Sequence, residues 1–169
     1  MMAKIGLFYG STSGSTLKVA EMIQQAFKPD AVDLIDVAKA SPEDLNKYQA
    51  LILGTSTWHW GGLQDEWAAF EDQLTKEALA GKTVAFFGLG DQKRYGDHFV
   101  DGMGLLYEKV RPTGARTVGT WPKDGYHYDA SAADLAGRLV GLALDEDNEP
   151  DKTRDRVRRW VKQLKKELR

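Results

Sequence analysis

The feature that most constrains the fold is a regular alternation of short apolar runs and stretches of helical periodicity along the 169 residues. The apolar runs predict strands at 5–9, 31–36, 50–54 and 82–87, and a fifth strand in two pieces at 117–119 and 139–144. Between and after them, helical patterns occupy 16–27, a short stretch from 41, 65–79, 99–110 and 152–168. Strands that alternate with helices predict a parallel sheet covered by helices on both faces. We therefore expect one α/β domain over residues 1–169.

Three unusual loops follow the carboxyl ends of the first, third and fourth predicted strands. They span residues 10–16, 55–64 and 88–98. In a parallel sheet of this kind, ligands bind beyond the carboxyl ends of the strands, where the winding of the chain reverses. The three loops are therefore expected to meet at one binding site.

The loop 10–16 contains five hydroxyl side chains around Gly14 and lies between a strand and a helix. Free backbone N–H groups and the positive end of a helix dipole make such a loop an anion site. It has no lysine, so it is not a nucleotide triphosphate loop, and it does not match G-x-G-x-x-G. It suits one compact phosphate held by neutral donors. A Ser/Thr-rich turn that caps a helix is the alternative.

The other two loops place aromatic side chains beside small residues. Trp58 and Trp60 lie in the second loop and Tyr95 in the third. Two aromatic planes beside a phosphate site suit a flat heterocycle, and glycines let the backbone approach its edge. Burial of each tryptophan in the core or an interface is the alternative.

These motifs, in this order, resemble those of the long-chain flavodoxins, a family of electron shuttles that carry FMN. The resemblance covers essentially the whole chain and rests on Gly10 to Thr16, Thr57-Trp58 with Gly61, Gly88 to Gln92 with Tyr95, Asp124 to Tyr126, and Val140 to Asn148. It implies a flavodoxin-like three-layer sandwich with a five-stranded parallel sheet of order 2-1-3-4-5. The segment 119–137 would be the insertion that splits strand five, and a solvent-covered loop is the simplest form for it.

The resemblance also implies roles for individual residues. Ser11 to Thr16 would hold the FMN phosphate, Trp58 and Tyr95 would stack on opposite faces of the flavin, and backbone at 58–61 and near Gly90 would face its edges. The expected FMN-binding residues are Ser11, Thr12, Ser13, Gly14, Ser15, Thr16, Ser56, Thr57, Trp58, His59, Trp60, Gly61, Gly88, Leu89, Gly90, Asp91, Tyr95 and His98. No catalytic residue and no metal ligand is expected.

The chain departs from the family pattern beside both aromatic residues. His59 and the bulky Trp60 follow Trp58, Lys93 and Arg94 precede Tyr95, and His98 stands where an asparagine is common. The two cations would favour negative charge on the flavin and raise its potential, unless both side chains point into water, where screening weakens them.

Composition limits the classes of function. The chain has no cysteine, which excludes disulfides, thiolate metal sites and cysteine-ligated clusters. The chain contains no run of about 20 apolar residues, so no membrane span is expected. Residues 1–150 carry 14 Lys/Arg against 22 Asp/Glu, whereas residues 151–169 carry nine against three. The acidic body argues against nucleic-acid binding and fits docking onto a basic protein.

Composition makes a cytoplasmic protein the default. The resemblance to long-chain flavodoxins implies a monomeric, low-potential one-electron carrier that shuttles electrons between redox proteins and does not act as an enzyme. The partners that it implies include a pyridine-nucleotide-dependent reductase, and nitrogenase or other reductive enzymes. The alternative on the same fold is an FMN-dependent NAD(P)H quinone or azo reductase. That enzyme needs room above the flavin, which Trp58 and Tyr95 would fill.

Overall fold

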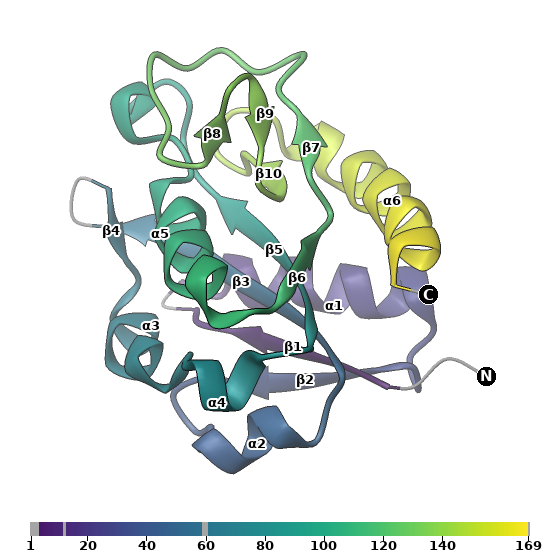
Figure 1. Cartoon of the computed structure of the whole chain (residues 1–169). Helices are drawn as coiled ribbons and strands as arrows, with labels where there is room; N and C mark the ends of the chain where they lie inside the picture. Colours follow the sequence, from purple (N-terminus) through teal and green to yellow (C-terminus); the bar gives the residue numbers. More distant parts are fainter. Residues whose placement is uncertain (1–3, 12, 59–60, 169) are drawn as a thin grey trace.

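A parallel sheet forms the middle layer of the computed structural model, which describes residues 4–11, 13–58 and 61–168 (Figure 1). Its strands lie in the order β10 (Leu142–Leu144), β5 (Thr83–Leu89), β3 (Ala50–Trp58), β1 (Ile5–Tyr9) and β2 (Val32–Asp36). A further strand, β6 (Arg116–Val118), pairs with residues 83–85 of β5, while β10 pairs with residues 87–89. The fifth strand is thus split, and the expected order 2-1-3-4-5 is confirmed.

Helices cover both faces of this sheet. On one face, α1 (Ser15–Phe27) and α6 (Pro150–Glu167) pack side by side; α5 (Asp101–Val110) lies across the other face, next to α3 (Asp65–Phe70) and α4 (Lys76–Leu79). The short α2 (Pro42–Asn46) contacts α4, and single 3-10 turns lie at η1 (Glu71–Gln73), η2 (Gly96–His98) and η3 (Arg111–Thr113). Among the described residues, none of the helices is long and apolar enough to cross a membrane.

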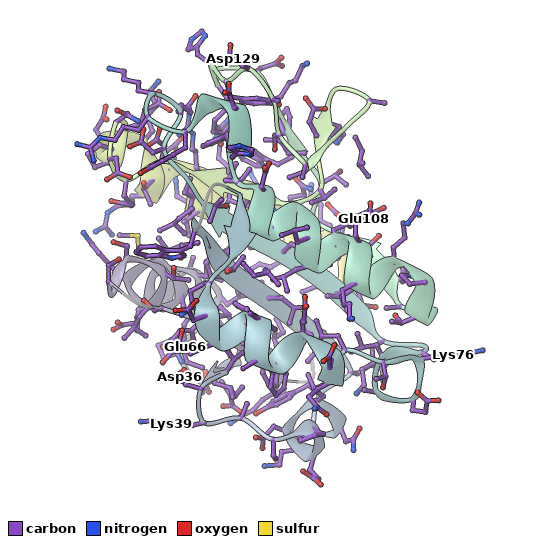
Figure 2. The ribbon with its side chains drawn as sticks, turned by 90° about the vertical axis from the view of Figure 1, so that its left-hand side faces the viewer. Asp36, Lys39, Glu66, Lys76, Glu108 and Asp129 are labelled. Carbon is purple, nitrogen blue, oxygen red and sulfur yellow. The ribbon has the colours of Figure 1, made fainter. Side chains whose placement is uncertain are left out.

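The core consists of the central strands and the apolar stripes of the helices. Two fully buried tryptophans anchor the layers: Trp67 Nε1–H donates to Gly54 O (2.7 Å), and Trp160 Nε1–H donates to Gly119 O (2.8 Å). Their indole N–H groups are therefore satisfied inside the apolar layer, as burial requires. Charged side chains such as Glu108 and Lys76 project from the surface (Figure 2).

The helix predicted over 65–79 is wrong as one continuous element. The chain leaves α3 at Phe70, makes the η1 turn and starts again at α4. Thr75 begins the second piece, because its hydroxyl accepts from Ala78 N–H (3.2 Å) as an N-cap. Trp67, Phe70 and Leu74 are nevertheless buried, as the pattern predicted.

The third strand is longer than predicted. β3 continues to Trp58, because Thr55 and Ser56 pair with β5 and the end of the strand pairs antiparallel with β4 (Gly62–Leu63). The prediction of a loop from residue 55 was therefore wrong. Ser56, Thr57 and Trp58 lie on a strand, which fixes their positions more firmly than a loop would.

The prediction of one strand over 139–144 was also wrong. The chain bends at Val140 and Gly141, and β9 (Arg138–Leu139) and β10 belong to different sheets. Gly141 lies so close to β5 that a Cβ atom there would be 2.1 Å from Phe86 O. β9 pairs with β7 (Trp121–Pro122) and β8 (Asp134–Leu135) in a small antiparallel sheet. The segment 119–137 is therefore not a simple solvent-covered loop: it contains paired strands and buries Trp121 and Tyr126.

Candidate functional site

A pocket of about 400 Å³ opens at the carboxyl ends of β1, β3, β5 and β10. Its walls come from the segments that follow these strands, and its volume is in the range of small-ligand sites. The pocket is lined by Ser13, Ser15, Ser56, Thr57, Trp58, Gly61, Leu89, Gly90, Asp91, Arg94, Tyr95, Glu146 and Asp147. Segments far apart in the sequence therefore meet at the edge where the parallel sheet predicts a ligand.

The first wall is the hydroxyl-rich turn before α1. Ser11 Oγ accepts from Gly14 N–H (3.1 Å) and Leu17 N–H (3.4 Å), and Gly14 has φ +91°, a conformation that suits glycine. Ser13 and Ser15 of the same turn line the pocket, and their hydroxyl oxygens lie 3.5 Å apart. The positive end of the α1 dipole lies at the same place. The turn thus combines neutral donors with a field that favours an anion.

The second wall is the end of β3. The Trp58 indole N–H donates to Ser56 Oγ (2.5 Å), and Thr57 Oγ1 accepts from Gly102 N–H (2.9 Å) at the start of α5. Beneath this wall, His98 Nδ1 lies 2.9 Å from Asp101 Oδ2. A Cβ atom on Gly61 would lie 2.8 Å from both of these atoms. The pair therefore supports the backbone of Gly61 directly.

The third wall is the loop that follows β5. Asp91 Oδ1 accepts from the N–H groups of Lys93 (3.0 Å) and Arg94 (2.9 Å), and Tyr95 N–H donates to Asp91 O (3.0 Å). Tyr95 is 44% exposed and Trp58 is 38% exposed. They are two of the four large apolar side chains that are exposed among the described residues. Large aromatic faces left open inside one pocket indicate a site for an apolar, flat group.

The charge of the pocket is mainly negative, because Asp91, Glu146 and Asp147 face one guanidinium, that of Arg94. Burial raises the pKa of Asp147, and the charges of Asp91 and Asp145 raise it further. Burial would also raise the pKa of Asp91, but hydrogen bonds from Arg94 N–H, Asn148 and Lys93 N–H lower it overall. These carboxylates therefore disfavour any further negative charge on a group bound in the pocket.

Comparison with known proteins identifies the family of the chain. A model of the flavodoxin family matches residues 7–160. The chain is 50% identical over 168 residues to a flavodoxin of Synechococcus elongatus, and the match covers 99% of each chain. The chain belongs to the flavodoxin family. It is also 45% identical over 169 residues to flavodoxin 1 of Escherichia coli K12, covering 99% of this chain and 96% of that one.

The solved structures agree with the family assignment. The fold matches the crystal structure of a Fusobacterium nucleatum flavodoxin bound to flavin mononucleotide with a TM-score of 0.93 and 34% identity, covering 99% of this chain and 100% of the other. A point mutant of the same flavodoxin, also bound to flavin mononucleotide, matches with the same TM-score. The flavodoxin family therefore accounts for the whole architecture.

The structure brings most of the predicted site residues together. Ten of the residues expected at the site line the pocket: Ser13, Ser15, Ser56, Thr57, Trp58, Gly61, Leu89, Gly90, Asp91 and Tyr95. Ser11, Gly14 and His98 do not line the pocket: Ser11 and Gly14 are bonded to each other in the turn before α1, and His98 lies against Gly61. Thr16 is 2% exposed and Gly88 packs against Met103, so neither lines the pocket. Thr12, His59 and Trp60 lie outside the described residues.

Two acidic pocket residues were absent from the predicted site. Glu146 and Asp147 lie two and three residues after β10, the last strand of the sheet. An acidic run such as 145–147 is usually a solvated loop, so residue type alone did not mark them. Their position could have identified them, because the carboxyl ends of all parallel strands lie at the same edge of the sheet and these residues follow such a strand.

Proposed function

We propose that the pocket binds FMN non-covalently and that the protein carries single electrons between redox proteins. The observation that carries this proposal is that Trp58 and Tyr95, both exposed, line the same pocket as Ser13 and Ser15. One ligand that unites a phosphate with a flat ring satisfies both ends of the pocket. FMN is such a ligand, and when bound it supplies reversible one-electron redox chemistry.

In this proposal the turn before α1 holds the phosphate. Ser13 and Ser15 offer hydroxyl and backbone donors at the positive end of the helix, and Ser11 and Gly14 shape the turn that carries them. Each hydrogen bond to a charged group contributes about 1.5–3 kcal/mol. Several such bonds hold a phosphate without a basic side chain.

The remaining walls position the ring and set its reduction potential. Trp58 and Tyr95 flank the ring, while the backbone near Gly61 and Gly90 faces its edges. Because Asp91, Glu146 and Asp147 make the pocket negative, they oppose the addition of an electron and lower the potential. The arrangement suits a low-potential carrier.

The partners follow from the surface charge. Residues 1–150 carry an excess of acidic side chains, so a basic redox protein is drawn into a weak, electrostatically steered encounter. We propose a pyridine-nucleotide-dependent reductase as donor or acceptor, and nitrogenase or another reductive enzyme as a further partner, with the exchange taking place in the cytoplasm. Flavodoxins are electron-transfer proteins rather than enzymes. A quinone or azo reductase is not favoured, because two aromatic walls leave little room for a second substrate.

The test uses Ser15→Asp, which places a carboxylate against the phosphate site. Aspartate is favourable at the first position of a helix, so the fold should be retained. We expect FMN affinity to fall about 100-fold, equivalent to losing one or two hydrogen bonds to a charged group, while riboflavin affinity falls less than about threefold. Titration of the apoprotein with each flavin, followed by flavin fluorescence, measures both. Equal losses for the two flavins would exclude the phosphate assignment.

A further inference from the structure

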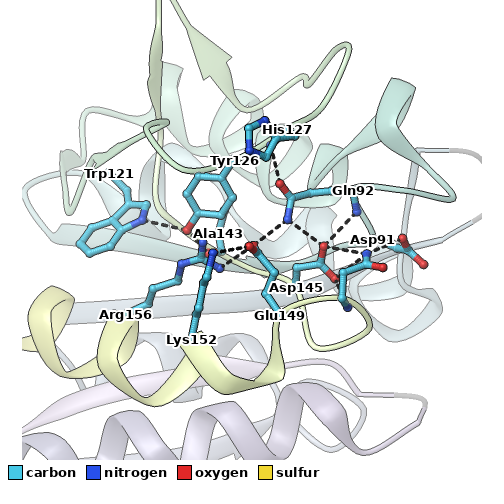
Figure 3. Close-up of polar contacts among 11 residues, drawn as sticks. Asp91, Gln92, Trp121, Tyr126, His127, Ala143, Asp145, Glu149, Lys152 and Arg156 are labelled. Carbon is cyan, nitrogen blue, oxygen red and sulfur yellow. Dashed lines mark hydrogen bonds and ion pairs between the residues drawn. The ribbon is translucent and has the colours of Figure 1, made fainter.

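The loop that carries Tyr95 is attached to the turn after β10 through the side chain of Gln92 (Figure 3). Gln92 is buried, and its Nε2–H₂ group donates to Asp145 Oδ2 (2.8 Å) and to Glu149 Oε1 (2.9 Å). Its Oε1 accepts from His127 N–H (2.5 Å). One amide therefore joins three segments: the Tyr95 loop, the turn 145–149 and the segment between β6 and β10.

The backbone of the same loop is attached to the same turn. Gln92 N–H also donates to Asp145 Oδ2 (3.1 Å). At the preceding residue, Asp91 Oδ1 accepts from Asn148 Nδ2 (2.8 Å). Two successive residues of the loop are thus fixed to one turn, just before the chain reaches Tyr95.

The turn 145–149 is itself firmly held. Asp145 is fully buried and accepts from Asn148 N–H (3.0 Å) as well as from Gln92. Burial alone would raise the pKa of Glu149, but hydrogen bonds from Lys152 and Gln92 and the charge of Arg156 lower it to about 2. Glu149 therefore stays ionised and keeps accepting from Gln92 across the neutral pH range.

Arg156 also holds this turn, through its ion pair with Glu149. Its Nη1 lies 3.1 Å from Glu149 Oε1, and its guanidinium lies over the ring of Tyr126 at 4.2 Å from the centroid. The Tyr126 hydroxyl donates to Ala143 O (2.5 Å) of β10 and accepts from Trp121 Nε1–H (2.9 Å). The attachment point of the Tyr95 loop is thus part of the buried body of the molecule.

We infer that Gln92 is a positioning residue, which holds the Tyr95 loop against the turn 145–149 and thereby fixes one wall of the pocket. This inference rests on the proposed function, since the wall is defined by the flavin it would face. Gln92 does not line the pocket and acts through Asp91 and Tyr95. A buried amide that is fully satisfied orders the segment that bears it, whereas a partly satisfied one loosens it.

The experiment compares Gln92→Met with Gln24→Met. Gln24 is the control, because its Nε2 also donates from a side chain that is not fully exposed, to Val32 O (2.8 Å), on the β2 side of the fold and away from the pocket. For each variant we would measure the melting temperature of the apoprotein, the FMN dissociation constant and the visible circular dichroism of the bound flavin. The dichroism reports the packing of aromatic rings on the flavin, which general stability does not alter.

We expect Gln92→Met to weaken FMN binding at least about tenfold and to change the flavin dichroism, while Gln24→Met stays within about twofold with an unchanged spectrum. A Gln92→Met variant that lowers only the melting temperature would overturn the inference. If that variant does not fold, Asn148→Ala decides, because it removes the bonds from Asn148 Nδ2 to Asp91 and Asp145 and leaves Gln92 in place. At least about a threefold loss is expected, and no change would contradict the inference. Failure of the unmodified protein to bind FMN would instead refute the proposed function.

Discussion

The two aromatic walls of the pocket are built by different kinds of contact. Trp58 lies at the end of β3, where backbone pairing with β4 and β5 fixes the chain. Tyr95 lies in a loop outside the sheet, and the side chains of Asp91, Gln92 and Asn148 fix that loop. Backbone pairing depends little on side-chain identity, whereas a side-chain network depends on every member and on its ionisation. The Tyr95 wall should therefore be the more sensitive one.

The largest effect is expected at low pH, where the side-chain network behind the Tyr95 wall loses the charge of Glu149. The folded pKa of Glu149 is about 2, below its usual 4.5, so this group contributes stability above pH 4.5 that is lost as the pH falls toward 2. Glu149→Gln removes that dependence. Urea unfolding of the apoprotein between pH 6 and pH 2.5 should show the unmodified chain losing on the order of 2–3 kcal/mol more than the variant. Parallel pH curves would contradict the role of Glu149 in the Tyr95 wall.

Removing each ring tests whether both walls hold the flavin. Trp58→Ala and Tyr95→Ala should each weaken FMN binding by about 2 kcal/mol, since stacking of a flat heterocycle on an aromatic ring contributes about 1–3 kcal/mol. Fluorescence titration of the apoproteins measures the loss. Trp58→Phe and Tyr95→Phe keep a ring and should recover most of the affinity. An alanine variant that binds FMN normally would remove that residue from the site.

The support beneath the Trp58 wall can be tested at Gly61. Gly61 has φ +102°, and an added Cβ would lie 2.8 Å from His98 Nδ1 and Asp101 Oδ2. Gly125 has φ +89° with nothing within 4 Å of such a Cβ, so Gly125→Ala carries the backbone strain alone. The positive φ alone should cost each variant about 1–2 kcal/mol of stability. The clash with His98 and Asp101 should add to the loss in Gly61→Ala and should also weaken its FMN binding. Thermal unfolding and flavin titration compare them, and equal effects would deny the contact with His98 and Asp101.

The smallest effect is expected from the cations beside Tyr95. Arg94 lines the pocket but is 81% exposed, with its Nε 4.0 Å from Asp91 Oδ2, whereas Lys93 does not line the pocket. Arg94→Met should lower the flavin potential by about 10–40 mV, equivalent to about 0.2–1 kcal/mol for one electron, and less at high salt. Lys93→Met is the matched control and should leave the potential unchanged. Equal shifts in a redox titration would show a long-range charge effect instead.

Much of the fold was predictable because it depends on local signals. The short helix predicted from residue 41 is such a case, because Ser41 forms a capping box with Asp44 and Pro42 stands in the first turn of α2. The break after Phe70 was missed because Thr75, a good cap, stands inside an otherwise helical pattern. The bend at Gly141 lies where the backbone approaches Phe86 too closely for a Cβ atom, and the two residues are more than 50 positions apart in the sequence. Local periodicity carries no information about such a contact.

The site was predictable where chemistry and position coincide, as in the hydroxyl turn and at Trp58. Asp147 was missed because an acidic residue in a turn has no signal that separates a solvated side chain from a pocket wall. The role of Gln92 could not be predicted either. It depends on Asp145 and Glu149, whose distance from Gln92 in space is set by the pairing of β10 with β5.

The position of β10 near the end of the chain has a consequence for biosynthesis. While the ribosome is still making residues beyond β6, the nascent chain can pair β2, β1, β3 and β5, and it already contains the hydroxyl turn, Trp58 and Tyr95. Domains fold as their sequence emerges, but Asp145 and Glu149 do not yet exist at that stage. Gln92 can already accept from His127 N–H, but the bonds that tie Asp91 and Gln92 to the turn 145–149 form only once β10 and that turn have been made. Firm capture of the cofactor therefore has to wait until β10 and the turn 145–149 have been made.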